Sequence, residues 1–372
     1  MTIDPAVVPG LLLLALELLA LAAIGFVVAR VALRQTDDRM ALAQGLLIGL
    51  ALWGLTANFV MYLMPGMAGA AVAWVITLAL AVWLARRAPS TLRLPPRTVA
   101  GFAVAALVLF WIFLAGRQLL SIVDASLHLG LAASIRAGGF PPVFPWHPGV
   151  PAPYHYGVDM LIGLLAPPFG PDLSFTTELL GAYIWTSFAL VVAMALLRRG
   201  GWTSLLILAP LLLTTAAWTH LGFITPPPDI LQMPVPAGMT TVGLRTALTG
   251  LYWPEVSLQW QGEHEASPPN IWKPLFALAY ALAFSILERV TARERRDVIC
   301  HVVLAILLGF LGLVDEAVAL TVLLLWTFFE AERFVRAWPT HPIRHKEALR
   351  AGLGPSLSAL LLIGGVGSSR GC

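Results

Sequence analysis

The sequence predicts an all-α polytopic membrane protein with about ten transmembrane helices plus a short re-entrant or interfacial segment. Two observations predict this class. Hydrophobic residues make up 58% of the chain and charged residues only 12%, which is about half of the charged share found in soluble domains. The hydrophobic residues also form long runs, and a helix needs about 20 such residues to cross a bilayer. Lipid is therefore the expected solvent for most of this chain.

Ten apolar runs are candidates for membrane spans. They lie at 9–33, 41–63, 66–85, 99–119, 176–197, 202–223, 271–288, 299–314, 317–332 and 351–366. An eleventh run, at 157–167, is short and leads into consecutive prolines. Its length and its prolines favour a re-entrant or interfacial helix over a complete crossing.

The distribution of Lys and Arg supports this topology. When the run at 157–167 does not cross, most of the 23 basic residues fall on one side of the membrane. The exceptions are Arg117, Arg136, Arg245, Lys273 and Arg370. Because cytoplasmic loops carry an excess of basic residues, the bias predicts an external N-terminus and external loops at 120–175 and 224–270.

One apolar run is too long for a single span and carries two carboxylates in its middle. The apolar run that begins at Cys300 contains Asp315 and Glu316 in its middle. A single helix of that length would be about 50 Å long, against a hydrocarbon core of about 30 Å. A break at the acidic pair instead makes two short spans and places both carboxylates at the external surface.

In the second span, Gly45 and Gly49 form a small-xxx-small pair that predicts close helix packing.

Charge and motif content exclude several function classes. The net charge of +3 comes from basic residues in short loops between apolar runs, so no nucleic-acid partner is expected. Cys300 and Cys372 form no spaced pair, which argues against a disulfide framework and a cysteine metal site. The Walker A, GxGxxG, HExxH and GxSxG motifs are absent from the sequence, so the enzyme classes that depend on them are not indicated.

Ionisable residues gather in the first external loop. Asp124 and His128 are four residues apart and share one face of a predicted helix, and Arg136 lies two turns further along the same stripe. Apolar residues on a neighbouring face predict that this helix lies along the membrane surface. The glycines and prolines at 138–142 end it. A polar cluster at the mouth of a span is costly to keep there, and this one is therefore a candidate functional site.

The chain returns to the bilayer through a proline-rich segment that carries His147, Tyr154 and His155. This return can fold its histidines over Asp124 and His128. We interpret Asp124 and His128 as members of a functional site in this loop. Further candidate residues of the site are Arg136, His147, Tyr154, His155 and Lys273. The candidates for a second acidic site are Asp315 and Glu316.

Each of these residues also has a structural interpretation. Asp124 suits a charge at a helix N-terminus, where the helix dipole stabilises it. The histidines at 128, 147 and 155 suit amphipathic positions at the level of the lipid headgroups. Arg136 suits contact with anionic lipid.

Two further carboxylates have open roles. Asp159 lies at the start of the short run and is either a helix cap or a member of the site. Glu17 lies inside the first span and needs a partner, for which Arg117 at the external end of the fourth span is the candidate.

The first external loop carries a pattern that spans Asp124 to Gly157: D-x-x-x-H, then a GGFPP turn, then the aromatic segment YHYG. This pattern resembles the first module of bacterial polytopic glycosyltransferases of the GT-C superfamily. The later acidic turn at 313–316 is similar to a feature of the same superfamily. The resemblance covers residues 99–335.

The resemblance implies a GT-C-like fold with three regions. These are a three-span N-terminal segment at 1–98, a catalytic core at 99–335, and a cytoplasmic linker with a last span at 336–372, whose shortness suggests truncation or loss of activity. It also implies transfer of a hexose or pentose from a polyprenyl-phosphate donor to a glycan, lipid or protein acceptor. Asp124 would be the general base, or would orient the acceptor or a divalent metal such as Mg²⁺ or Mn²⁺. His128 would be the second catalytic residue and, with Asp124, a candidate ligand of any metal. The residues that would bind the substrate or its phosphate are Arg136, His147, Tyr154, His155 and Lys273. The implied location is a bacterial cytoplasmic membrane, with the active loops facing outside.

Two other functions are compatible with the sequence. A lipid or solute transporter or flippase would require ionisable residues along a path near the bilayer midplane. The predicted spans offer Glu17 and a few neutral polar residues for such a path. A non-catalytic membrane assembly subunit is the third function, and it is consistent with the short C-terminal region.

Overall fold

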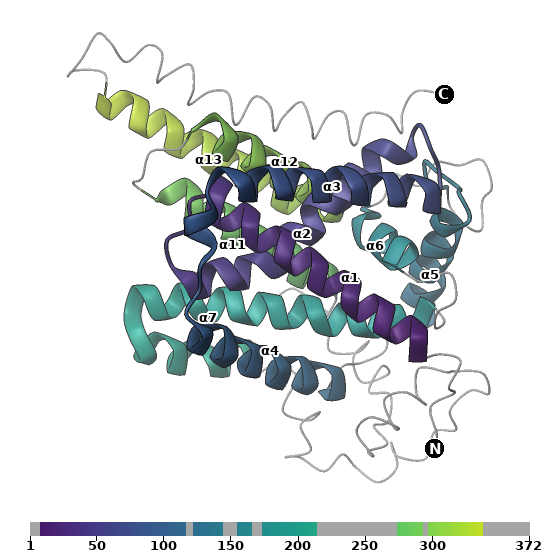
Figure 1. The fold of residues 1–372 in the computed structure, drawn as a ribbon, viewed down its shortest axis with the longest axis horizontal. Coiled ribbons are helices and arrows are strands. Elements are labelled where there is room, and N and C mark those ends of the chain that lie inside the picture. The colour runs from purple at the N-terminus through teal and green to yellow at the C-terminus, as the bar shows by residue number, and fades with distance from the viewer. Residues whose placement is uncertain are drawn as a thin grey trace.

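The computed structural model describes residues 8–116, 122–143, 155–165, 173–213, 274–292 and 297–337. This part of the chain is all helical and contains no β-strand (Figure 1). The elements are α1 (Val8–Val27), η1 (Val28–Ala32), α2 (Asp38–Met61), α3 (Met67–Arg87), η2 (Pro89–Leu92), α4 (Pro96–Gly116), α5 (Ile122–Arg136), α6 (Gly157–Leu165), α7 (Leu173–Leu213), α11 (Pro274–Thr291), α12 (Val298–Val314) and α13 (Glu316–Ala337). The predicted all-α class is therefore confirmed.

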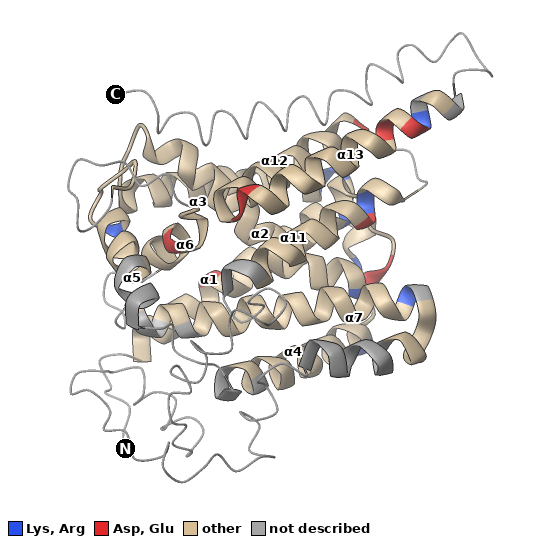
Figure 2. Ribbon diagram, turned by 180° about the vertical axis from the view of Figure 1, so that it is seen from behind, with Lys and Arg blue, Asp and Glu red and all other residues tan. Residues whose placement is uncertain are grey.

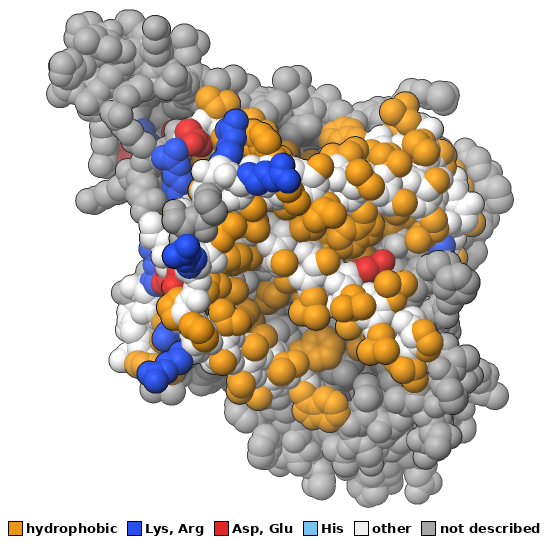
Figure 3. Space-filling model, in the orientation of Figure 1, with side chains coloured by type: hydrophobic (Ala, Val, Ile, Leu, Met, Phe, Trp, Pro, Cys, Tyr) orange, Lys and Arg blue, Asp and Glu red, His pale blue; other side chains and the backbone are white. Residues whose placement is uncertain are grey.

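Four helical stretches in the described residues are long and apolar enough to cross a membrane. They are Val8–Ala32, Asp38–Met61, Met67–Arg87 and Leu179–Arg198. The stretches Pro96–Trp111 and Val298–Val314 are apolar but shorter. Large hydrophobic side chains are exposed along α1, α3, α4 and α13, and hydrophobic side chains cover much of the face of the molecule that Figure 3 shows. Such a surface is unfavourable in water and indicates a membrane protein. The predicted span at 351–366 lies outside the described residues.

Helix α2 forms the centre of the bundle, with α1, α3, α7 and α12 packed around it. Its contact with α1 depends on glycines. A Cβ atom on Gly49 would overlap the carbonyl oxygen of Leu21, and one on Gly25 would overlap the carbonyl oxygen of Gly45. The two backbones therefore touch, as the Gly45–Gly49 pair predicts, and Gly25 supplies the matching surface on α1.

Helices α12 and α13 meet at Asp315, where the predicted break is present. Asp315 has an extended backbone conformation, and its carboxylate accepts a hydrogen bond from the Val318 amide at 2.9 Å. This carboxylate therefore caps α13, because the first amides of a helix have no partner within it. Asp297 caps α12 in the same way through the Cys300 amide.

Helix α7 continues from the predicted span at 176–197 into the first part of the run at 202–223. The change of direction occurs at Gly201, whose φ of 64° lies in the left-handed region. Glycine tolerates this conformation because it has no Cβ atom. The rest of the predicted run, beyond residue 213, lies outside the described residues.

Helix α5 forms where the sequence predicts a helix, and its apolar face packs against other helices. Leu131, Ala132 and Ile135 are fully buried, and α5 packs against α6 and α7. The approach of α6 is close, since a Cβ on Gly163 of α6 would overlap the Ala132 carbonyl oxygen. The predicted end is correct, since Gly138 has a φ of 93° and closes the helix.

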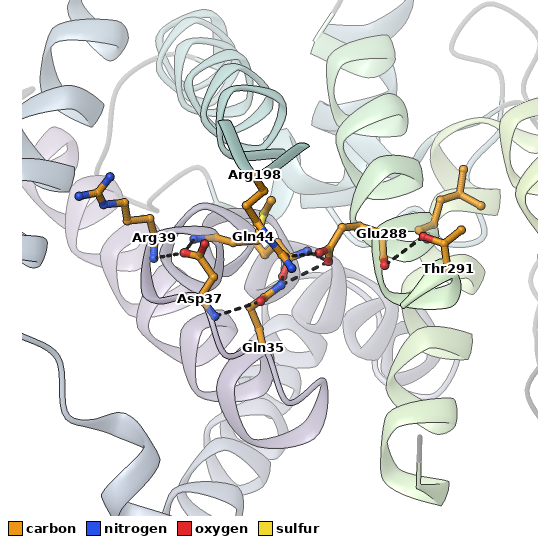
Figure 4. A network of polar contacts seen from close by, with 9 residues as sticks. Gln35, Asp37, Arg39, Gln44, Arg198, Glu288 and Thr291 are labelled. Atoms are coloured by element: carbon orange, nitrogen blue, oxygen red, sulfur yellow. Dashed lines mark hydrogen bonds and ion pairs between the residues drawn. The ribbon is translucent and has the colours of Figure 1, made fainter. Parts of the chain in front are cut away.

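At the opposite end of the bundle, a network centred on Glu288 joins α2, α7 and α11 (Figure 4). One oxygen of the Glu288 carboxylate accepts hydrogen bonds from Gln35 Nε2 at 3.2 Å and from Gln44 Nε2 at 3.3 Å. Its other oxygen accepts from the guanidinium of Arg198. Gln35 and Gln44 are almost fully buried, and Gln35 Nε2 also donates to Gln44 Oε1 at 3.4 Å. The Glu288 carboxylate is thus the shared acceptor for both buried amides.

Removal of the Glu288 carboxylate should therefore destabilise the fold more than removal of its exposed cationic partner, Arg198. We expect Glu288→Leu to lower the free energy of unfolding by about 2–4 kcal/mol. The change removes the acceptor of the buried Gln44 Nε2 and leaves Gln35 Nε2 only its longer hydrogen bond to Gln44. Arg198→Gln should lower it by about 1 kcal/mol or less, because that side chain is partly solvated. Unfolding midpoints of the two variants in mixed micelles test this order. Equal losses would show that the ion pair, rather than the buried amides, is the stabilising part.

Candidate functional site

A buried ion pair joins α5 and α6, the two short helices that come between α4 and α7 in the sequence. His128 Nδ1 of α5 lies 2.7 Å from Asp159 Oδ1 of α6. The residues are 8% and 1% exposed. The close packing at Gly163 holds the two helices near enough for this contact. Helices α5 and α6 lie side by side at the end of the bundle opposite most of the Lys and Arg residues that the structure describes (Figure 2).

Two opposing effects act on the Asp159 carboxyl. Burial raises its pKa, because the charged form is disfavoured away from water. The hydrogen bond from His128 and the positive charges of His128 and His155 lower it in part. Oxygen Oδ2 of Asp159 is buried and accepts no hydrogen bond from any residue that the structure describes. Buried polar atoms normally have partners, so this oxygen marks a place where a polar ligand group can bind.

The pair gives His128 a defined chemical role. When Nδ1–H donates to the Asp159 carboxylate, Nε2 is the basic nitrogen of the ring. A carboxylate in this position also fixes the orientation of the imidazole, as in other sites where histidine accepts or returns a proton. The arrangement is therefore suited to general acid–base chemistry.

A second contact connects this site to the turn between α12 and α13. His155 Nδ1, two residues before α6, lies 3.6 Å from Glu316 Oε2. Next to it, a Cβ on Gly157 would crowd the carbonyl of Leu313, so the start of α6 packs directly on the end of α12. The acidic turn predicted as a second site thus lies beside the first.

The Glu316 carboxyl should give a measurable pH dependence of stability. Its hydrogen bond with His155 is the main cause that lowers its pKa below 4.5. The stabilisation is therefore present above pH 4.5, the unfolded value, and is lost as the pH falls through the lower folded pKa. We expect Glu316→Gln to be less stable than the native protein by under about 1 kcal/mol at pH 5.5, because Glu316 is half exposed.

Thermal unfolding between pH 3 and 5.5 measures this difference. The native protein and Glu316→Gln should converge at the acid end of the range. His155→Gln should weaken the same pH dependence, since it removes the partner. A difference that stays constant across the range would contradict the ion pair.

Aromatic residues fix the start of α6 against α2. The hydroxyl of Tyr156 donates a hydrogen bond to Asn58 Oδ1 at 2.8 Å. Burial raises the pKa of Tyr156, and the neighbouring Tyr62 adds to the shift. The ring of Phe140 lies edge-on to both Tyr62 and Tyr156. These contacts hold the YHYG segment against the bundle, next to the ion pair.

The remaining predicted residues are placed as follows. Asp124 is in the first turn of α5, one turn before His128, but its side chain lies outside the described part of the structure. Arg136 is in the last turn of α5. Asp315 is the cap of α13. Outside the described residues lie His147, Tyr154 and Lys273, and also Arg117, the predicted partner of Glu17.

Asp159 is the main residue whose role the sequence left open between helix cap and site member. The structure makes it the partner of His128. Asn58, on α2, was not predicted at all. A signal for Asp159 exists in the sequence: it is the one charged residue in the apolar run at 157–167, and such a residue needs a partner. Nothing in the sequence alone connects Asn58 to Tyr156, 98 residues away.

The described residues contain no group of three or more His, Cys, Asp or Glu side chains arranged to hold a metal ion. His128 and Asp159 supply one potential ligand each, which is fewer than a complete metal site needs. Comparison of the chain with protein-family models, with curated proteins and with solved structures finds no match.

Proposed function

We propose that the protein is a membrane glycosyltransferase that moves a sugar from a polyprenyl-phosphate donor to an acceptor on the extracytoplasmic face of a bacterial cytoplasmic membrane. The observation that carries the proposal is the buried His128–Asp159 pair. It lies on the helix that begins near Asp124 and on the helix that follows the YHYG segment, so the two halves of the sequence pattern meet there. An acid–base pair at the end of a helical bundle suits a reaction on a lipid-linked substrate.

The distribution of charge supports the orientation. Among the described side chains, most arginines lie at the end of the bundle near η1 and η2, and α5 carries the exception at Arg136 (Figure 2). Under the positive-inside rule, the arginine-rich end is cytoplasmic and the end with α5 and α6 is external. The proposal includes about ten spans, and it is supported by the four helical stretches among the described residues that are long and apolar enough to cross a membrane.

The proposed reaction is a displacement at the anomeric carbon of the donor sugar. An acceptor hydroxyl attacks that carbon, its bond to the phosphate oxygen breaks, and polyprenyl phosphate leaves with the electron pair. Asp124 or His128 takes the hydroxyl proton as general base. Arg136 and Lys273 stabilise the negative charge on the leaving phosphate. Asp159 acts through His128 as a positioning residue, because it holds the imidazole in one orientation.

A transporter or flippase is the second candidate, and one observation favours it. Glu17 lies inside α1, and its Oε2 is buried without a hydrogen-bond partner among the described residues. An ionisable group in a span often marks a path for ions or substrate. In this function, the His128–Asp159 pair would bind and release a proton at the end of such a path.

The test is a comparison of membranes that contain the native protein or a variant. We expect Asp124→Asn and His128→Gln to lower the amount of transferred sugar by about 100-fold or more, since general acid–base catalysis contributes 10²–10⁴. Lipid extracts analysed by mass spectrometry should show accumulation of a polyprenyl-phosphate sugar in these variants. Asp297→Asn is the control, because asparagine also caps a helix and Asp297 lies at the other end of α12.

Unchanged product in Asp124→Asn at equal protein level would overturn the assignment of Asp124. Unchanged product in both variants would overturn the proposal that the protein is a glycosyltransferase. Solute uptake or lipid movement in proteoliposomes that lack any sugar donor, together with its loss in Glu17→Gln, would instead establish the transporter.

A further inference from the structure

Five exposed arginines lie together at the end of the bundle opposite α5 and α6. They are Arg39, Arg86, Arg87, Arg93 and Arg97, and we call them the arginine face. They come from the start of α2, the end of α3, the segment around η2 and the start of α4. Arg30 holds η1 against η2, because its Nε donates a hydrogen bond to the Thr91 carbonyl oxygen at 2.9 Å. Basic side chains gather along this end of the molecule in Figure 3.

Nearby carboxylates are already matched with other groups. Asp38 pairs with Arg30, and Asp297 pairs with Arg34. Asp37 accepts hydrogen bonds from the first amides of α2. None of the arginines of the face forms an ion pair with a carboxylate in the described part of the chain. The face therefore carries a net positive charge that an external anion can match.

The surface beside the arginine face is apolar. Val82 and Trp83 of α3 and Val99 of α4 are exposed large hydrophobic residues. The guanidinium of Arg87 lies 3.8 Å from the centre of the Trp83 ring. This cation–π contact places a charge at the boundary between the apolar surface and the polar end. A ligand for this boundary needs an anionic group joined to hydrocarbon chains.

We propose that the arginine face binds the phosphodiester headgroups of anionic phospholipids. The arginines contact the phosphate oxygens, which the planar guanidinium suits well. The acyl chains of the same lipid lie against the exposed side chains of α3 and α4. This binding is a property of the arginine-rich end and is independent of the proposed reaction at α5 and α6.

Native mass spectrometry of the purified full chain, with phosphatidylglycerol or phosphatidylcholine added, tests the proposal. We expect bound phosphatidylglycerol in excess over phosphatidylcholine, and about fivefold weaker binding for each arginine removed, as in Arg87→Gln and Arg86→Gln/Arg87→Gln. Arg34→Gln is the matched control, since it removes one charge at the same end from a residue that has a carboxylate partner. Added inorganic phosphate at the same concentration should not compete.

Three results would overturn the proposal. The first is equal binding of the two lipids. The second is an effect of Arg34→Gln as large as that of Arg87→Gln, which would indicate a response to total charge alone. The third is full competition by inorganic phosphate, which would identify a site for a free anion. Unfolding midpoints in phosphatidylcholine micelles check that the variants are folded, and Trp83→Leu provides a variant that weakens the site without a change in charge.

Discussion

Replacement of Gly49 by alanine is expected to lower the free energy of unfolding by about 3 kcal/mol or more. The added methyl group would overlap the carbonyl oxygen of Leu21, which belongs to the backbone of α1. A flexible side chain could move away, but a helix backbone moves only if the whole helix shifts. Overpacking in a core destabilises by about 1–3 kcal/mol, and a backbone clash should lie at or above the upper end of that range. Helix α1 would separate from the centre of the bundle.

The same substitution at Gly101 is the control. Gly101 lies on α4, and a Cβ there would meet nothing within 4 Å. Alanine favours a helix over glycine by up to about 1 kcal/mol, so Gly101→Ala should be neutral or slightly stabilising. The yield of monodisperse protein in detergent and its unfolding midpoint measure both variants. A Gly49→Ala protein as stable as Gly101→Ala would show that α1 and α2 do not pack as closely as described here.

The glycine contact illustrates what sequence spacing can predict. Gly45 and Gly49 are four residues apart, and this local spacing is visible without any knowledge of the fold. Their partner surface at Gly25 was not predicted, because the choice of partner depends on how two separate helices are arranged. The break at Asp315 was predictable for a similar local reason: a pair of carboxylates in the middle of an overlong apolar run is too costly to leave in lipid.

The candidate site shows where such reasoning stops. The four-residue spacing placed Asp124 and His128 on one helix, which the structure bears out for the backbone of α5. The burial of α5 and its pairing with α6 depend on the path of the chain through the turn at Gly138 and the return to Tyr156. That path is set by contacts with α2, such as the hydrogen bond of Tyr156 to Asn58. Local pattern carries no information about contacts between distant segments.

The His128–Asp159 pair should be worth more to the folded protein than any exposed ion pair in the described residues. Removal of one partner from a buried pair leaves the other buried without compensation, which costs about 3–5 kcal/mol. We expect losses of this size for His128→Leu and for Asp159→Leu. The double variant should be less destabilised than the sum of the two single losses, because leucines of similar volume leave no buried charge.

A double-mutant cycle of unfolding midpoints in mixed micelles measures the coupling between the two residues. A coupling of at least about 1 kcal/mol is expected for residues in direct contact. Additive losses would mean that His128 and Asp159 act independently, and they would remove the main support for the candidate site.

The pH dependence of the single variants separates the electrostatic role of the pair from its packing role. Because burial raises the folded pKa of Asp159, the stability linked to its neutral form is fully present below the unfolded pKa and is lost as the pH rises through the folded pKa. His128 reduces this loss, since its hydrogen bond and charge lower the pKa. From pH 4 to pH 8, His128→Gln should therefore lose more stability than the native protein, and Asp159→Asn should lose less. A purely packing role predicts parallel curves for all three proteins, and parallel curves would contradict the electrostatic assignment.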